Sequence, residues 1–155
     1  ALGFQMVSDT FPKPDAILSK AISTGAPFEK MSKLCLFQPS EIHETNFAVG
    51  RHTANPTGNV VLPATDELWN LHFKYLDFDR LHARHKLLAS GLGNRDVEQG
   101  WGHRYWFDEQ QLRQDFDCFK DQAQNLAEIG ALAETLHACP RWWRNRFPNY
   151  PTVDV

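Results

Sequence analysis

The stretch ELWNLHFKY, residues 67–75, constrains the fold more than any other part of the chain. Its large apolar side chains alternate with polar ones, which is the period of a β-strand and not of a helix. The apolar positions are Trp69, Leu71, Phe73 and Tyr75, and the polar row is Asn70, His72 and Lys74. The pattern predicts a strand that buries an aromatic face and presents an imidazole and an ammonium group on the other face.

Two amphipathic helices are predicted after this strand. The first covers residues 78–90, with Asp77 as its N-cap and Gly91 as its stop. The second begins at Asp108, which forms a capping-box pair with Gln111. Both helices carry apolar residues at steps of three and four, so each is expected to bury one face.

The rest of the chain contains shorter elements. Residues 2–7 are predicted to form a buried strand, residues 16–24 a weak helix and residues 41–49 a second strand, whereas residues 91–106 are predicted to be a loop. The second amphipathic helix is interrupted or ended at Gly130, and a short helix is expected up to His137. A chain of 155 residues can bury one core. We therefore predict an α/β fold with a mixed sheet followed by helices. Because the sequence starts directly in strand-forming residues, we expect an incomplete domain.

Composition limits the partners of the chain. A net charge of −3 gives no global attraction to nucleic acid, and no apolar run is long enough to span a bilayer. The three cysteines are widely spaced and form no Cys-x-x-Cys pair, which is typical of a reduced intracellular protein. We expect a cytoplasmic protein. The basic and aromatic tail PRWWRNRF leaves two alternatives open, peripheral contact with an anionic membrane or packing of its tryptophans into the core.

The tract FAVGRHTANPTGN, residues 47–59, places His52 where neither a helix nor a strand explains it. A rigid polar turn is a suitable position for a metal-binding imidazole. The neighbouring Arg51 has the planar group needed for a bidentate contact with phosphate. The alternative is an ordinary loop histidine, and the residues alone leave both interpretations open.

Other polar residues also have two interpretations. His72 and Lys74 form either a solvated sheet face or a floor that receives an anionic ligand. Asp9 ends the first strand, where α/β proteins place functional carboxylates, or is a turn residue. His82 and His85 have a spacing that can share a metal, but His85 lies on the apolar stripe and is interpreted as a core residue.

Four segments, in order, resemble the C-terminal half of bacterial family-two-type glycosyltransferases. They are GFQMVSDTFP, FAVGRHTANPTG, ELWNLHFKYLDFDRLHARH and GWGHRYW. The resemblance covers roughly residues 3–107. It implies a GT-A fold, a Rossmann-like α/β sandwich, in which residues 1–107 form the acceptor and metal side and residues 108–155 add C-terminal helices and the tail.

The resemblance implies a transferase that moves a sugar from a nucleotide-sugar donor to a saccharide or another hydroxyl acceptor. The reaction is expected to be inverting and to use Mn²⁺ or Mg²⁺. The family places its Asp-x-Asp strand and nucleotide-binding half upstream of these segments, and this chain contains neither. The implied roles are His52 as a metal ligand, Asp9 as the catalytic base, Arg51, His72 and Lys74 as donor-phosphate ligands, and Trp101 and His103 as acceptor-binding residues.

Two alternatives to this enzyme are consistent with the same residues. The first is a non-catalytic carbohydrate-binding or scaffold domain that uses Trp101, His103 and Tyr105 without a metal. The second is a small hydrolase built around His52, His72 and His103, although no carboxylate lies at a recognisable ligand spacing from them.

Overall fold

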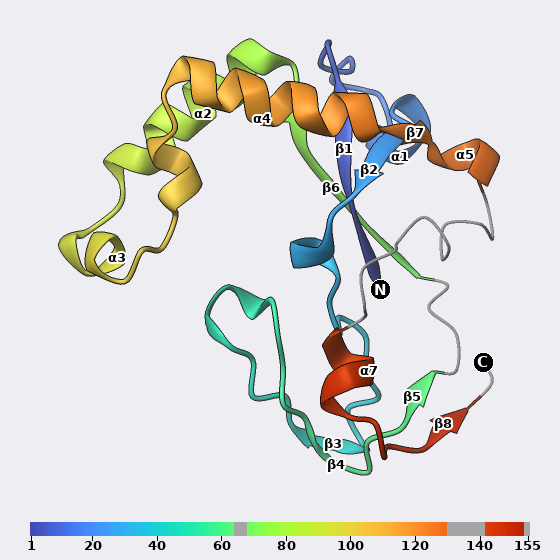
Figure 1. Ribbon diagram of the computed structural model, residues 1–155. Coiled ribbons are helices and arrows are strands. Elements are labelled where there is room, and N and C mark those ends of the chain that lie inside the picture. Colours follow the sequence, from blue (N-terminus) through green and yellow to red (C-terminus); the bar gives the residue numbers. More distant parts are fainter. Residues whose placement is uncertain (64–67, 130–141, 154–155) are drawn as a thin grey trace. The chain divides into compact units, whose positions relative to one another are not determined.

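The computed structural model describes residues 1–63, 68–129 and 142–153 (Figure 1). The chain forms two compact units, each built from segments that are distant in the sequence. Unit 1 contains Ala1–Phe4, Pro27–His72 and Leu126–Val155, and unit 2 contains Gln5–Ala26 and Phe73–Asn125. The division predicted after Phe107 concerns function and stays a prediction.

A mixed sheet has the strand order β6-β1-β2-β7. Its strands are β1 (Leu2–Ser8), β2 (Thr24–Pro27), β6 (Trp69–Leu76) and β7 (Gln124–Asn125). β2 and β7 are antiparallel. β1 and β6 run in the same direction, because the Leu2 amide donates to the Leu68 carbonyl at their starts and the Asp77 amide donates to the Ser8 carbonyl at their ends. The α/β class predicted from the sequence is confirmed.

Strand β1 is buried over almost its whole length, as its apolar sequence predicts. Every residue from Leu2 to Val7 is buried, and the side-chain amide of Gln5 donates to the backbone carbonyl of Met6 at 3.1 Å. A Cβ on Gly3 would lie 2.3 Å from the backbone carbonyl carbon of Met31. Glycine is therefore required at this position so that the neighbouring backbone can approach.

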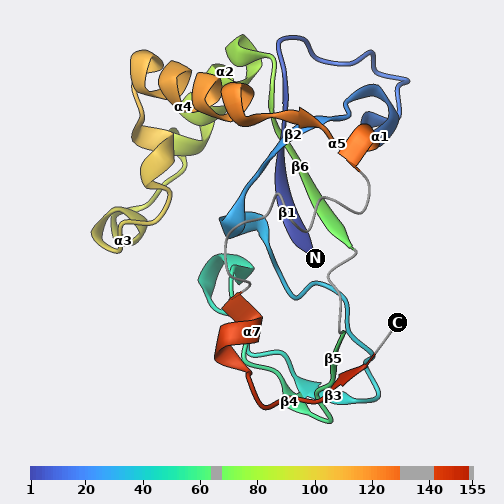
Figure 2. The ribbon, with the colours of Figure 1, turned by 45° about the vertical axis from the view of Figure 1, so that its right-hand side comes forward.

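The two amphipathic helices are confirmed, together with the N-caps predicted for them, but the second, predicted to extend to Gly130, ends at Gln122 because Gln124 and Asn125 pair with β2 in the sheet. Helix α2 spans Phe78–Ser90, and the Asp77 carboxylate accepts hydrogen bonds from two backbone amides of its first turn. Helix α4 spans Glu109–Gln122 and begins with the reciprocal bonds between Asp108 and Gln111, at 3.1 and 2.8 Å. Figures 1 and 2 both show α2 beside α4.

The core of unit 2 contains the apolar faces of these helices together with strand residues. Its buried members are Val7, Tyr75, Phe78, Leu81, Leu112 and Phe116, with Phe107 and Phe119 packed against them. Burying each large side chain stabilises the fold by roughly 2 to 3 kcal/mol. Sequence periodicity therefore located this core correctly.

Unit 1 has a second core, which is built around the C-terminal tail. Helix α7 (Trp142–Arg146) contributes Trp143, which packs with Leu62 and Phe147. The indole of Trp142 donates to the carbonyl of Ser32 at 3.1 Å. Two small sheets complete the unit, β3 (Ile42–Glu44) with β4 (Thr57–Gly58), and β5 (Leu62–Pro63) with β8 (Thr152–Val153). Trp143 is therefore a core residue and is not available to anchor the tail to a membrane.

Several short elements differ from the sequence-based predictions. The helix predicted over residues 16–24 is only α1 (Leu18–Ala21), and Thr24 begins β2 because hydrogen bonds with neighbouring strands outweigh a weak helix propensity. The loop predicted over residues 91–106 contains α3 (Asn94–Glu98) and the 3₁₀ turn η3 (His103–Trp106). The chain also forms α5 (Leu126–Ile129). The short helix predicted up to His137 lies outside the described residues.

Strand β6 is confirmed, but its predicted aromatic face is buried only in part. Residues 69–74 are all half-buried, whichever face they belong to, and Tyr75 and Leu76 are both buried. The polar row is covered by other segments. The side-chain amide of Asn70 donates to the Met31 carbonyl at 2.8 Å, and the ammonium group of Lys74 lies over the Tyr105 ring. In the described parts of the chain, no helix is long and apolar enough to cross a bilayer.

Candidate functional site

The turn that carries His52 holds the imidazole through a backbone carbonyl. The turn is the 3₁₀ segment η2 (Val49–Arg51), in which Gly50 has φ 76° and Arg51 has φ 55°. Nδ1 of His52 lies 2.7 Å from the carbonyl oxygen of Lys30. A Cβ on Gly50 would lie only 2.8 Å from the imidazole, so the ring rests on the glycine. In this arrangement Nδ1 donates and the lone pair of the neutral ring is on Nε2.

This geometry leaves His52 able to bind a cation through one nitrogen. Histidines that bind metals usually donate their other ring N–H to a carbonyl or carboxylate, which fixes the ring. The side chain is exposed. No group of three or more histidine, cysteine, aspartate or glutamate side chains that could hold a metal lies within the described ranges. His52 would therefore supply a single protein ligand among those residues.

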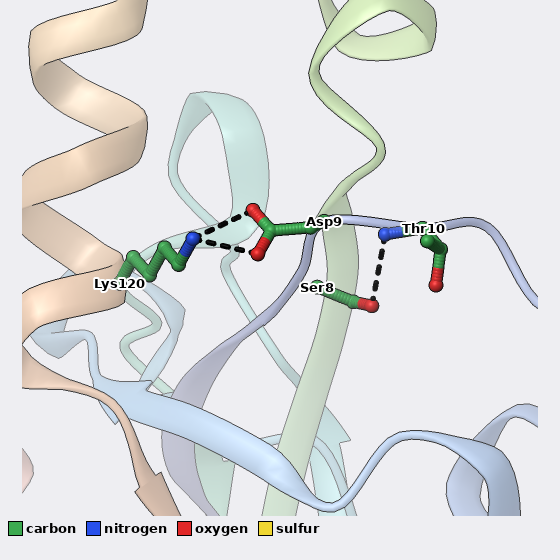
Figure 3. Close-up of polar contacts among 4 residues, drawn as sticks. All are labelled: Ser8, Asp9, Thr10 and Lys120. Atoms are coloured by element: carbon green, nitrogen blue, oxygen red, sulfur yellow. Dashed lines mark hydrogen bonds and ion pairs between the residues drawn. The ribbon is translucent and has the colours of Figure 1, made fainter.

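Asp9 lies at the end of β1, as predicted, and forms an ion pair with Lys120 of helix α4. Nζ of Lys120 is 2.8 Å from Oδ1 and 2.6 Å from Oδ2 of the carboxylate (Figure 3). The local turn is stabilised by Ser8, whose hydroxyl accepts from the Thr10 amide at 3.2 Å. Both side chains of the ion pair are exposed, so it contributes at most about 1 kcal/mol to stability. The carboxylate is accessible to a substrate but is partly neutralised by the lysine.

A partly buried polar cluster is the most distinctive polar arrangement of unit 2, and we call it the Lys74 cluster. It consists of Lys74 and Tyr75 from β6, His85 from α2, Arg104 and Tyr105 from η3, and Asp115 from α4. Nζ of Lys74 lies 4.6 Å from the centre of the Tyr105 ring. The His85 ring lies 5.2 Å from the same ring and nearly perpendicular to it.

Asp115 is the carboxylate of the Lys74 cluster. It accepts a hydrogen bond from the hydroxyl of Tyr75 and forms an ion pair with Arg104, with 3.2 Å between Nη2 and Oδ1. Burial, and then the adjacent Asp115, raise the pKa of Tyr75, so this phenol stays a neutral donor. These contacts join β6, η3 and α4 through one carboxylate.

Burial strongly perturbs the two basic groups of the cluster. It lowers the pKa of Lys74 from 10.5 to about 8, with further lowering by Arg84 and Arg104 and an opposing effect of Asp115. Burial also lowers the pKa of His85 from 6.5 to about 4, and the positive charge of Lys74 adds to this. The cluster is therefore rich in cations, with Asp115 as the carboxylate that opposes them.

His85 is buried without a satisfied polar environment. Its side chain is 1% exposed, and neither ring nitrogen has a hydrogen-bond partner of normal geometry among the described residues. A backbone group of Arg104 is nevertheless close enough to raise the pKa of the imidazole slightly against the effect of burial. Buried polar atoms without hydrogen-bond partners are rare in proteins, and those that occur often belong to functional sites.

The other residues predicted from the sequence lie at separate places. In unit 1, Arg51 is exposed and lies 5.6 Å from the centre of the Phe47 ring, and His72 is half-buried in β6. In unit 2, Trp101 and His103 are exposed just before and within η3. Of the site residues predicted from the sequence, Lys74 is the one that lies in the Lys74 cluster.

Sequence reasoning missed Asp115 and Arg104 and interpreted His85 only as a core residue. Nothing in the sequence marks Asp115 as a site residue, apart from its position near the apolar stripe of an amphipathic helix. The tripeptide Asp115-Phe116-Asp117 has the Asp-x-Asp pattern, but Asp117 is exposed whereas Asp115 faces the cluster. A second such tripeptide begins at Asp77, which caps α2. Both tripeptides therefore have structural explanations.

Comparison of the chain with protein-family models, with curated proteins and with solved structures found no match. The argument about function therefore rests on the residues and on the geometry described above.

Proposed function

We propose that this chain is the acceptor-side part of a GT-A-fold glycosyltransferase that moves a sugar from a nucleotide-sugar donor to a saccharide or another hydroxyl acceptor. One observation supports the proposal more than any other. Residues from two of the segments that resemble the family lie together in the Lys74 cluster: Lys74 and His85 come from ELWNLHFKYLDFDRLHARH, and Tyr105 comes from GWGHRYW. Two segments that are separate in the sequence thus contribute side chains to one partly buried polar cluster.

The chemistry of the Lys74 cluster suits a departing diphosphate. As the bond between the sugar carbon and the diphosphate oxygen breaks, negative charge grows on the leaving group. Cations placed beforehand in a site that excludes water stabilise that charge more than water does. Lys74, with Arg84 and Arg104 near it, supplies the positive charge. Near neutral pH most Lys74 side chains are protonated, because the pKa is about 8.

The acceptor must lose a proton when its oxygen attacks the sugar. Asp9 is the proposed base, since its carboxylate is exposed at the end of β1. In the proposed step, the acceptor oxygen forms the new bond to the sugar carbon, its proton passes to Asp9, and the diphosphate leaves with the electron pair of the broken bond. Nζ of Lys120 lies 2.8 Å from Oδ1 of Asp9, so the ammonium group holds this carboxylate in place.

A divalent metal is part of the proposal, with His52 as its protein ligand in this chain. The metal would neutralise charge on the donor diphosphate. Nε2 of His52 fits the role because Nδ1 is already occupied by the Lys30 carbonyl. Arg51 and His72 are the remaining proposed contacts to phosphate.

The test uses the full product of the reading frame that encodes these residues, with a panel of nucleotide-sugars and Mn²⁺. We expect release of nucleotide diphosphate, and a decrease of about 100-fold in Lys74→Met. Lys86→Met is the matched control, since Lys86 is an exposed lysine of α2, and its activity should be close to that of the wild type. His52→Ala should weaken metal-dependent nucleotide binding in calorimetric titration.

Two outcomes would contradict the proposal. One is a folded protein that neither transfers nor hydrolyses any donor of the panel. The other is tight nucleotide binding by residues 1–155 alone, because the resemblance assigns most nucleotide contacts to an upstream half.

A carbohydrate-binding domain is the second candidate, and one observation favours it. Trp101 and Trp106 are both exposed, on either side of Tyr105, and exposed aromatic rings can stack on the apolar faces of sugars. Metal-independent binding to a glycan array that is lost in Trp101→Ala, without donor turnover, would favour this candidate over the transferase.

A further inference from the structure

Unit 1 contains a pocket that the proposed transfer reaction does not use. Its volume is about 470 Å³, which lies within the range of small-molecule sites. It is lined by residues between Leu34 and Leu62, and the tract that carries His52 forms part of its wall through Phe47, Ala54 and Pro56. His52 itself does not line it. The tract 47–59 thus forms part of an apolar wall as well as carrying the His52 imidazole.

The walls of the pocket are joined by backbone hydrogen bonds. The Asn59 amide donates to the Glu41 carbonyl at 2.8 Å, and the Asn55 amide donates to the Thr45 carbonyl at 3.1 Å. Gly58, in β4, has φ 117°, and a Cβ there would lie 2.2 Å from the Glu41 carbonyl oxygen. Strands β3 and β4 are therefore held close together by backbone contacts, and we infer that the pocket between their flanking residues is preformed.

The polar groups of the pocket indicate what kind of head group a ligand carries. They are Gln38, Glu41, Thr45 and Asn59, and among the residues that the structure describes no lysine, arginine or histidine lines the pocket. Glu41 accepts a hydrogen bond from the side-chain amide of Asn59 at 2.9 Å. A carboxylate disfavours an anionic head group. Because amides and a hydroxyl both donate and accept hydrogen bonds, they suit hydroxyl groups better than an ammonium group, which only donates.

The remaining lining is apolar and partly open to water. Leu36 is 72% exposed and Phe37 is 51% exposed, and both line the pocket. Large apolar side chains exposed together at the mouth of a cavity are covered when a ligand with an apolar body binds.

We propose that this pocket binds an uncharged amphiphile, with an alkyl or prenyl body among the leucine, phenylalanine and valine side chains and a hydroxylated head group at Gln38, Glu41 and Asn59. The proposal is independent of the transferase, since the binding needs neither donor nor metal.

The probe is octyl β-glucoside, titrated calorimetrically into the protein below its critical micelle concentration. Glucose tests the head group alone, and octanoate tests an anionic head group on the same kind of chain. We expect octyl glucoside to bind, glucose to show no binding, and octanoate to bind at least about tenfold more weakly. Glu41→Gln should reduce this discrimination by strengthening octanoate binding.

A matched pair of variants separates specific binding from adsorption. Leu36 and Leu87 are both 72% exposed, but only Leu36 lines the pocket. Leu36→Ser should weaken octyl glucoside binding about tenfold, and Leu87→Ser should leave it unchanged. Equal weakening in both variants, equal binding of octanoate, or no binding to a protein with a wild-type melting curve would each overturn the proposal.

Discussion

Acidification should destabilise unit 2 through His85. The imidazole is 1% exposed and faces Lys74 from β6, Tyr105 and Arg104 from η3, and Asp115 from α4. Burial and the Lys74 charge lower the pKa of His85 from 6.5 to about 4. In the unfolded chain the imidazole binds a proton below about pH 6.5, whereas in the folded protein it does so only below about pH 4.

The size of the effect follows from this difference in pKa. The unfolded state binds more protons between about pH 6.5 and pH 4, so stability rises with pH in that window. The stabilisation is complete above about pH 6.5 and is lost as the pH falls towards 4. A difference of about 2.5 units between the unfolded and folded pKa values of His85 corresponds to about 3 kcal/mol of unfolding free energy. This free energy changes by up to about 1.4 kcal/mol per pH unit within the window. Lys74 stays charged throughout, since its pKa is about 8.

Urea denaturation between pH 4 and pH 8 measures this contribution, if the wild type is compared with His85→Gln. Glutamine does not titrate, so the difference in unfolding free energy between the two proteins should change by about 3 kcal/mol across the window. His82→Gln is the control, because His82 also lies on α2 but is less buried and is 3.9 Å from Glu109. Parallel stability curves for the wild type and His85→Gln would refute the reasoning. Such a result would show that the imidazole has the same pKa in the folded protein as in the unfolded chain.

Three further predictions concern stability. Gly58→Ala should destabilise the protein by about 1 to 3 kcal/mol because of its positive φ and the close Glu41 carbonyl. Gly91→Ala is the control and should be tolerated, since its Cβ would meet nothing closer than 3.6 Å. Equal denaturation midpoints for the two variants would show that β3 and β4 are held less closely than described. Trp143→Ala should cost about 3 to 5 kcal/mol in chemical denaturation, since this indole is buried in the core of unit 1, and a loss below about 1 kcal/mol would place it outside that core. Asp9→Asn should change stability by less than about 1 kcal/mol, and the change should shrink in high salt; a larger effect would mean that the ion pair is shielded from water.

Local sequence determined both ends of α2 and the start of α4. It did not determine the end of α4, which was predicted at Gly130 but lies at Gln122, because Gln124 and Asn125 pair with β2. Asp77 and the pair Asp108 with Gln111 satisfy backbone amides within their own first turns, so the signal lies within a few residues and does not depend on the rest of the fold. Strand β1 was predictable for a similar reason, since a continuous apolar run bounded by turn residues is typical of a buried strand.

Weak local preferences were decided by neighbours in space. Thr24 and Gly25 were expected at the end of a helix, but both pair with residues of β7 about 100 positions later in the chain, and sheet hydrogen bonds set their conformation. The half-buried polar row of β6 has the same origin. Alternation identifies the two faces of a strand but does not tell which segments cover the polar one.

The candidate sites show the same division. The sequence identified Lys74 from the alternation within its strand, and the turn around His52 from Gly50 two residues before it and the turn-forming residues after it, because both signals are local. Only the tertiary structure brought Asp115 to Arg104, 11 residues away along the chain, and to Tyr75, 40 residues away. A pairing of this kind depends on how a helix lies on a strand, and no local pattern encodes it. The Lys30 carbonyl that holds His52 is likewise 22 residues distant. The perturbed pKa values and the apolar pocket arise from such distant contacts, because desolvation depends on everything that packs around a group.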